Sequence, residues 1–348
     1  MASAAAAPTV DRMRGQARRS GRHHFPMAEF VARRVAAGLA TLFVVSVLIF
    51  IACNVLPGNV AELVLGKNAT PERVAALKVR LGLDSSLFER YLSWLGGILH
   101  GDFGNSAVAL ALNQPETSIS GTLGQPLFYS LLLAGITAVI LIPLTLVLGA
   151  IAGIYARRSL DHAISMPSLI LGGLPEFVTG TFLIWVFFSV LHVLPPVWTL
   201  RPGESPLQNA EGLILPVLTL LAVALGAGIR QVRAGMTEVL TQDYVQFARL
   251  NGISERRVLS RYAMRNALAP SVQTIAQNVQ YLLGGIIVVE SLFVYPGLGM
   301  YLVQAVLSRD TSKVQAAALI LAAIYIFINI VADIVVVYLV PRLRTAYS

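Results

Sequence analysis

Six long runs of almost uncharged residues constrain the fold of this chain more than any other feature, because each can cross a lipid bilayer as a helix. Only 13% of the 348 residues are charged and 56% are hydrophobic, so a soluble domain of this size could not cover its core. The sequence therefore predicts an all-α polytopic membrane protein with six transmembrane helices. The runs are residues 35–56, 128–156, 163–191, 213–229, 271–289 and 314–340.

The basic residues are distributed unequally between the two sides of these spans. Of the 26 Lys and Arg, 18 lie in residues 1–34, after the second span, in residues 230–270 or after the sixth span. Because cytoplasmic loops are rich in Lys and Arg, both termini are predicted to be cytoplasmic, in a cell or inner membrane. This topology accounts for the net charge of +8, so the lipid bilayer is expected as a partner and nucleic acid is not.

Residues 1–34 are polar and rich in arginine, and they are predicted to form a disordered basic cytoplasmic tail. A cleaved signal peptide is the alternative interpretation. The apolar run 35–56 corresponds to about 33 Å of helix, longer than the apolar region of a signal peptide. The first run is therefore interpreted as a transmembrane helix.

A long external loop, residues 57–125, separates the first span from the membrane core at 126–345. Its residues 71–81 and 87–99 have apolar side chains at helical spacing. Pro71 suits the first turn of a helix, and Gly82 suits its end. Two short helices are therefore predicted at the outer surface.

The cytoplasmic segment 230–270 is too polar and too long to be a simple turn, so a soluble partner is expected to meet it. Its apolar spacing predicts a short amphipathic helix that ends at Gly252, which can adopt the left-handed conformation. Ser254 is predicted to cap a second short helix with several charged residues. Binding of anionic lipid is an alternative role for its arginines. The first helix is defined by Val239, Leu240, Tyr244, Phe247 and Ala248, and the second carries Glu255, Arg256, Arg257 and Arg261.

The same segment resembles the coupling loop of ABC importer permeases of the dipeptide, oligopeptide and nickel family. The matching residues are Asp243, Tyr244, Val245, Phe247, Ala248, Arg249, Gly252, Arg257, Val258, Leu259, Arg265, Asn266, Ala267, Leu268 and Pro270. In that family this loop forms a helix that docks in a groove of the ATPase subunit. The resemblance implies this role for Asp243, Tyr244, Ala248, Arg249, Gly252 and Arg257.

The resemblance extends over roughly residues 30–345. It implies the type I importer permease fold, a second homologous permease subunit, two cytosolic ATP-binding subunits and an external solute-binding protein. Departures from the family pattern bear on the substrate subgroup and not on the architecture. Matching residues in the outer loops are Gly101, Asp102, Arg309 and Asp310, and the departures are Asn59, Leu250, Asn251, Tyr262 and Val340.

ATP hydrolysis needs a glycine-rich phosphate-binding loop with a lysine, and none of the three lysines lies in one. Lys67 alone follows a glycine, but Asn68 stands where Ser or Thr is needed and Ala61 where the first glycine is needed. ATP and Mg²⁺ are therefore expected on partner ATPase subunits, with no cofactor and no catalytic residue in this chain. The five histidines lack metal-ligand spacing, so no metal site is expected.

Three acidic residues lie within or at the end of expected spans, where a charge is costly unless it faces water or a partner. Glu176 is interpreted as lining a translocation path, or else as a structural carboxyl beside a proline kink. Glu290 is interpreted as part of a gate, or else as simple polarity at the span boundary. Asp333 is assigned to a structural hydrogen bond with Asn329 rather than to a contact with another subunit. The candidate path or gate residues are Pro175, Glu176, Glu290, Phe293, Pro296, Gly297 and Gly299.

The leading interpretation is a pore-forming permease subunit of an ATP-driven importer for dipeptides, oligopeptides or a related small solute. An ion-coupled secondary transporter, with Glu176 and Asp333 as proton sites, is the alternative, and the large cytoplasmic segment disfavours it. An intramembrane enzyme is disfavoured because the sequence has no paired acids and no Ser/His arrangement at useful spacing. The sequence leaves the solute open among peptides, nickel chelates, haem and other small molecules.

Overall fold

The computed structural model of the chain describes residues 26–55, 65–66, 69–82, 84–115, 118–199, 208 and 210–339. The side chains of a few helical residues within these ranges, among them Arg265, Leu268 and Pro270, are not described. The expectations for residues 1–25, Asn59, Ala61, Lys67, Asn68 and Val340 lie outside the described residues.

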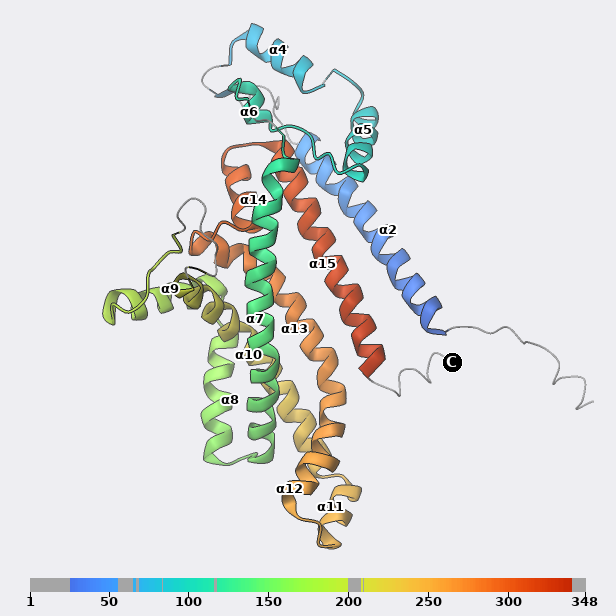
Figure 1. Cartoon of the computed structure of the whole chain (residues 1–348), viewed down its shortest axis with the longest axis vertical. Helices are drawn as coiled ribbons and strands as arrows, with labels where there is room; N and C mark the ends of the chain where they lie inside the picture. The colour runs from blue at the N-terminus through green and yellow to red at the C-terminus, as the bar shows by residue number, and fades with distance from the viewer. Residues whose placement is uncertain are drawn as a thin grey trace, which may run out of the picture.

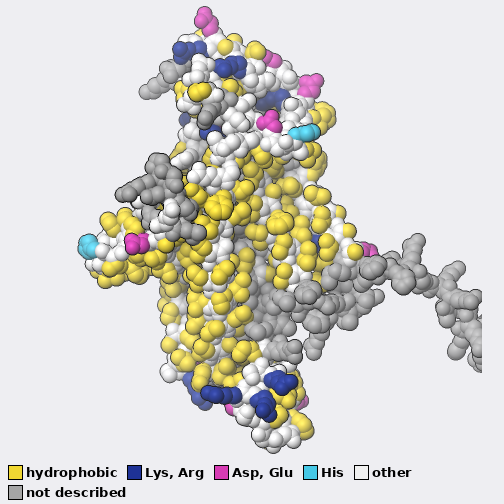
Figure 2. Space-filling model, in the orientation of Figure 1, with side chains coloured by type: hydrophobic (Ala, Val, Ile, Leu, Met, Phe, Trp, Pro, Cys, Tyr) yellow, Lys and Arg dark blue, Asp and Glu magenta, His cyan; other side chains and the backbone are white. Residues whose placement is uncertain are grey.

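Long helices run side by side along the length of the molecule (Figure 1). Four of them are long and apolar enough to cross a membrane. A further long helix, α13 (Met264–Leu292), contains the expected run 271–289, so the count of six spans stays a prediction. Hydrophobic side chains cover the sides of the molecule, and charged side chains gather at its ends (Figure 2). The four spans lie in α2 (Pro26–Val55), α7 (Ser120–Ile154), α10 (Glu211–Leu240) and α15 (Thr311–Leu339).

Two helices extend beyond the expected runs. Helix α2 begins at Pro26, so residues 26–34 are helical rather than part of a disordered tail, with Glu29 placed favourably in the first turn. Helix α10 continues past residue 229 to Leu240, because arginine and glutamine are good helix formers even where the sequence is polar. Part of the expected cytoplasmic segment is therefore continuous with a membrane helix.

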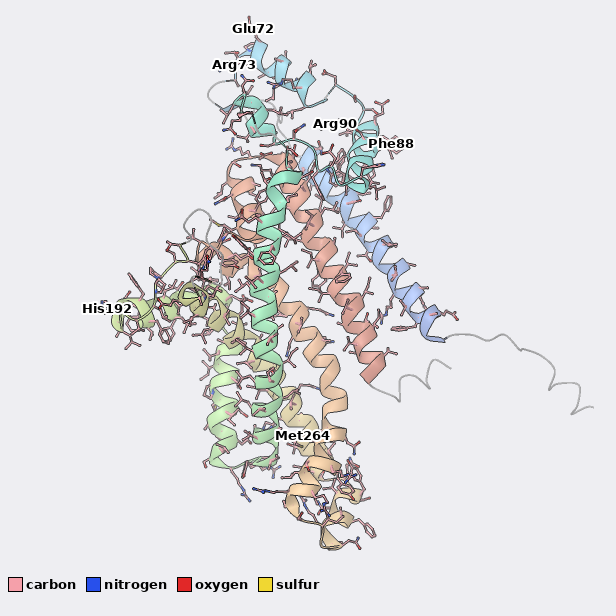
Figure 3. The ribbon with its side chains drawn as sticks, in the orientation of Figure 1. Glu72, Arg73, Phe88, Arg90, His192 and Met264 are labelled. Atoms are coloured by element: carbon pink, nitrogen blue, oxygen red, sulfur yellow. The ribbon has the colours of Figure 1, made fainter. Side chains whose placement is uncertain are left out.

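The third expected span, 163–191, is strongly bent in the structure, so its crossing of the membrane as one span stays a prediction. Helix α8 (Ser159–Gly172) and the pair formed by α9 (Glu176–Ile184) and the π-helix η2 (Trp185–Val190) meet at an angle of 109°. Pro175 lies at the bend with φ −61° and ψ 149°, and the residue before a proline avoids helical geometry. As a result α9 and η2 project sideways from the bundle toward His192 (Figures 1 and 3).

Helix α10 is the centre of the bundle. Of the residues in its most apolar stretch, 72% are buried, against 11–22% in the corresponding stretches of the other three candidate spans. It packs against α7 so closely that a methyl group on Gly149 would lie 2.5 Å from Val232, and one on Gly153 would lie 2.6 Å from Met236. A displacement of α10 must therefore displace α7.

The end of the molecule opposite α11 carries three short helices, α4 (Pro71–Arg80), α5 (Leu87–Leu99) and α6 (Ala107–Ala111) (Figure 1). The first two are the helices that the sequence predicts. Pro71 follows the N-cap residue Thr70, and Gly82 adopts φ +62° after α4 ends. In α5, Ser86 and Glu89 form a reciprocal capping box.

Candidate docking and gating sites

The segment 241–263, which we call the knob, projects from one end of the bundle (Figure 1). The predicted helix from Val239 to Ala248 is interrupted, because the chain turns at Thr241 and Gln242. The Thr241 hydroxyl donates to the Glu238 carbonyl at 2.7 Å, a local bond that competes with further helix. The knob consists of α11 (Asp243–Leu250), α12 (Glu255–Arg257) and the π-helix η4 (Val258–Ala263), and Met264 begins α13 (Figure 3).

Helix α11 has a buried face and an exposed apolar face. Val245 and Ala248 are buried against Val258, so Ala248 attaches α11 to η4 and does not present a contact. On the other side Phe247 and Leu250 are 68% and 86% exposed. Large apolar side chains displayed on a polar segment mark a surface for a protein partner. Neither residue is among those to which the resemblance assigns the coupling role, although Phe247 lies in the matching segment and opposite Val245 on a short amphipathic helix.

Gly252 ends α11 in the left-handed conformation, as expected, with φ +74°. Its N–H donates to the Arg249 carbonyl at 2.9 Å, and the Ile253 N–H donates to the Ala248 carbonyl at 3.2 Å. These two bonds form a Schellman motif, and Ile253 packs against the buried face of α11. Ser254 lies at the N-cap of α12, but within the described residues its hydroxyl makes no capping bond.

Two side-chain contacts stabilise the knob. Arg249 donates from Nη2 to Glu255 Oε1 at 2.8 Å and from Nε to Oε2 at 3.2 Å. These hydrogen bonds hold the pKa of the Glu255 carboxyl below its usual value. The Asn266 amide donates to the Tyr244 hydroxyl at 3.0 Å. Arg249 and Tyr244 therefore hold α11 in place, while Asp243 and Arg257 are exposed.

The expected gate residues Glu290, Gly297 and Gly299 meet at the start of α14 (Leu298–Leu307). Glu290 is fully buried, and its Oε2 accepts from the Gly299 N–H at 2.7 Å. Its Oε1 accepts from the Ser130 hydroxyl, which in turn accepts from the Leu298 N–H at 2.7 Å. Glu290 thus caps a helix N-terminus, where a negative charge is favoured, and joins α7, α13 and α14.

Two other gate candidates lie beside this cap. Phe293 is buried and its carbonyl accepts from the Trp198 N–H at 2.8 Å, whereas Pro296 is exposed. Between them, the buried Tyr295 hydroxyl donates to the Tyr129 carbonyl at 3.0 Å. The rings of Trp198 and Tyr295 lie 5.0 Å apart, centroid to centroid. The entry to α14 is therefore closed by packed aromatic side chains.

Glu176 has a different set of neighbours from the Glu290 cap. It is half-buried in the first turn of α9, directly after Pro175, and interacts with Tyr281 of α13. A methyl group on Gly285 would lie 3.0 Å from Glu176 Oε1. The bend before α9 therefore presents a carboxylate to α13.

The outer-loop candidates have different environments. Gly101 adopts φ +80°, and Asp102 accepts from the Gly104 N–H at 2.8 Å, which forms a tight turn. Arg309 is exposed with φ +58°. Asp310 is buried and accepts from the Ser106 hydroxyl, the Ala107 N–H at 3.1 Å and the Lys313 N–H at 3.4 Å. One carboxylate therefore caps both α6 and α15.

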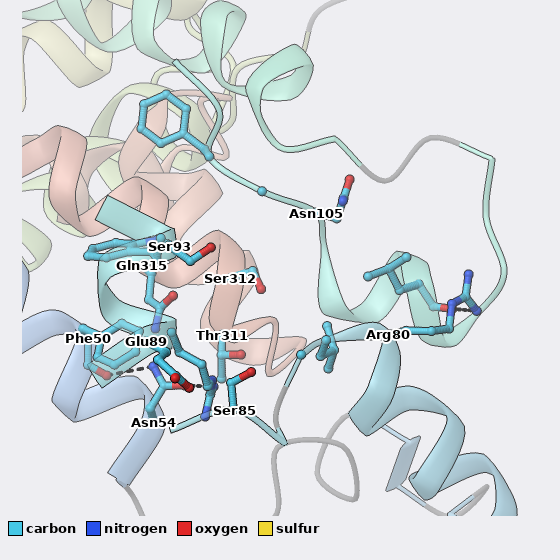
Figure 4. A pocket seen from close by; sticks show the side chains of 17 residues that line it. Phe50, Asn54, Arg80, Ser85, Glu89, Ser93, Asn105, Thr311, Ser312 and Gln315 are labelled. Carbon is cyan, nitrogen blue, oxygen red and sulfur yellow. Dashed lines mark hydrogen bonds between the residues drawn. The ribbon is translucent and has the colours of Figure 1, made fainter. Parts of the chain in front are cut away.

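A polar cleft of about 620 Å³ opens between α5 and the facing ends of α2 and α15 (Figure 4). Arg90 of α5 donates to the side-chain Oδ1 of Asn54 in this cleft, and Arg80 donates to Asn113 Oδ1 at 2.8 Å. Phe88 and Arg90 are labelled on α5 in Figure 3. The cleft is a concave polar feature at this end of the molecule.

Asp333 pairs with Arg34 of α2, with 3.3 Å between Oδ2 and Nη1, rather than with the expected Asn329. The sequence missed this pair because 299 residues separate its partners. Gly38 faces Ile326 and Ile330 in the same contact between α2 and α15. Asp333 thus has a partner within the chain, although not the one that the sequence interpretation named.

Comparison with known proteins gives matches along most of the chain. Residues 145–345 match the family of binding-protein-dependent transport system inner membrane components, and residues 27–112 match the N-terminal region of such components. A peptide transport system permease protein of Brucella abortus is 34% identical over 319 residues, which are 91% of this chain and 99% of the relative. The glutathione transport system permease protein of Escherichia coli has the same identity and coverage.

Proposed function

This chain belongs to the family of binding-protein-dependent transport system inner membrane components, and we infer that it is a permease subunit of an ATP-driven importer for peptides. The multi-pass helical architecture is the type I importer permease fold. The names of the relatives favour peptides, glutathione among them, over nickel or haem as the solute.

The proposed mechanism rests on one structural observation, the exposed apolar face of α11. Phe247 and Leu250 extend from a knob that is firmly attached to α10 and α13. A partner that covers these side chains can push or pull α10, because only two residues separate α10 from α11. The partner is a cytosolic ATP-binding subunit, and the knob is its docking site.

The assembly follows from this assignment. Two ATP-binding subunits hold ATP and Mg²⁺, a second homologous permease completes the pore, and an external binding protein delivers the solute to the outer helices and their cleft. Both termini then lie in the cytoplasm, on the side of the knob, and this chain performs no chemistry itself. Closure of the ATP-binding subunits moves α11 and α10, and the pore alternates between outward and inward access.

The test of this function is co-purification of the tagged chain in mild detergent. We expect two ATP-binding subunits and a second permease to accompany it, and the eluate to hydrolyse ATP. A chain that purifies alone and moves solute in vesicles without ATP would instead establish the ion-coupled transporter. In that case Glu176 and Asp333 would be the residues to examine first.

Glu176 is assigned to the translocation path, and its charge is expected to matter. Glu176→Gln keeps the size of the side chain but removes the charge beside Tyr281, so peptide uptake should fall about tenfold with the complex still assembled. Uptake of a labelled dipeptide, measured from pH 5 to 8, checks this. Glu211→Gln, the same change in the exposed first turn of α10, is the control. Normal uptake by Glu176→Gln at every pH would mean that Glu176 has a structural role and does not line the path.

A further inference from the structure

An ion pair between the buried Asp161 and the half-buried Arg233 joins α8 to α10 at the end of the bundle that carries the knob. Arg233 Nε donates to Asp161 Oδ1 at 2.6 Å, and Nη2 donates to Oδ2 at 2.7 Å. Asp161 also accepts from the Arg157 N–H at 2.8 Å and the Ser165 hydroxyl at 2.9 Å, and it is only 1% exposed. A bidentate contact between a guanidinium and a carboxylate fixes the relative orientation of the two groups as well as their distance.

Helix α8 touches α10 again at its other end, directly before the bend. A methyl group on Gly226 would lie 2.4 Å from the Ser168 carbonyl oxygen and 2.9 Å from Gly172 Cα. The two backbones are therefore in contact there. Attachment at both ends prevents α8 from pivoting on the Gly172 contact, so α8 must follow α10.

The pair also lies on a short connection between the docking site and the path. Arg233 lies two turns before Leu240, where α10 gives way to the knob, and Asp161 lies in the first turn of α8. The other end of α8 leads through the bend at Pro175 to Glu176. Movement of the knob can therefore reach the start of α9 through α10, the ion pair and α8.

We propose that Asp161 and Arg233 are positioning residues that force α8 to follow α10, so that movement of the knob reaches the bend at Pro175. This inference rests on the proposed function, because it requires a partner that moves the knob. The pair itself touches neither solute nor nucleotide. Breaking it should leave the docking movement intact but stop its transfer to α8.

The test measures the movement directly in the assembled complex. With Cys53→Ser as background, spin labels are placed at Phe327 on α15 and at either Ile170 on α8 or Gln242 before α11, all of them exposed. In the wild type, trapping ATP with vanadate should change both distances. In Asp161→Asn the change at residue 242 should persist, and the change at residue 170 should fall at least threefold.

Asp333→Asn is the matched control, because it removes the same charge from an ion pair that joins α2 to α15 instead. It should leave the movement at residue 170 unchanged. Arg233→Lys keeps the charge but loses the bidentate contact. Ser165→Ala removes one of the hydrogen bonds to Asp161. Each variant should reduce the change at residue 170, but less than Asp161→Asn does. If Asp161→Asn does not assemble, these two variants decide the question.

Undiminished movement at residue 170 in the assembled Asp161→Asn complex, or in both milder variants, would overturn the proposal. Absence of movement at residue 242 in the wild-type complex would instead contradict the proposed function. The two failures are therefore distinguishable in one set of measurements.

Discussion

Gly252→Pro should give a chain that still enters the membrane but retains at least tenfold less of the ATP-binding subunits on purification. Proline fixes φ near −65°, whereas Gly252 has φ +74°, and proline removes the N–H that bonds to the Arg249 carbonyl. The change costs about 3 kcal/mol or more at this turn. Loss of the Schellman motif separates α11 from η4 and misplaces Phe247 and Leu250. Quantification of co-purified subunits, with their ATPase activity, measures the effect.

Gly82→Pro provides a close control for this experiment. Gly82 also has a positive φ, +62°, and its N–H also bonds to a carbonyl three residues earlier, that of Val79 at 3.1 Å. It lies after α4, at the end of the molecule opposite the knob. Equal retention of the ATP-binding subunits by both variants would mean that the knob is not their docking site.

Gly297→Ala should destabilise the protein by about 3 kcal/mol or more, because the new methyl group would overlap a buried carboxylate. Its Cβ would lie 2.1 Å from Glu290 Oε1, and Glu290 cannot retreat without leaving the N–H groups of Gly299 and Met300 unpaired. The corresponding fall in Tm is roughly 6–12 °C. Thermal unfolding of the purified protein in detergent measures it.

Gly284→Ala is the control for this prediction. It lies on the same α13 that carries Glu290, but a methyl group there would meet no described atom within 4 Å. Its Tm should stay within about 2 °C of the wild type. If Gly297→Ala is as stable as Gly284→Ala, the Glu290 cap does not hold α14 in place.

The sequence predicts the helical class well because apolar runs of membrane length have few other solutions. It also predicts the turn at Gly252, since a glycine after an amphipathic stretch is a local signal. The sequence suggested a proline kink beside Glu176 but not a bend of 109°, because Gly173, Leu174 and Pro175 lie inside a continuous apolar run. Hydropathy alone cannot distinguish a straight span from a broken one.

The candidate sites were harder to predict because their geometry depends on residues that are distant in sequence. Glu290 is paired with Ser130, and Asp161 with Arg233, 72 residues away. Family resemblance implies a coupling role for Ala248, but the structure shows that Ala248 is buried while Phe247 and Leu250 face outward. Local sequence patterns predict where helices and turns lie, whereas the role of a side chain depends on contacts with residues that are distant in sequence.

The double cap made by Asp310 has a consequence for how the protein is made. Ser106 and Asp310 are 204 residues apart, so at about 5–20 residues per second roughly 10–40 s of synthesis separate them. During that interval α6 lacks the carboxylate that caps its first turn, and the contact between α6 and the start of α15 cannot form. The end of the molecule that carries α6 is therefore completed only after Asp310, which directly precedes the last membrane helix, has been synthesised, and a chain truncated before residue 310 would leave α6 without this cap.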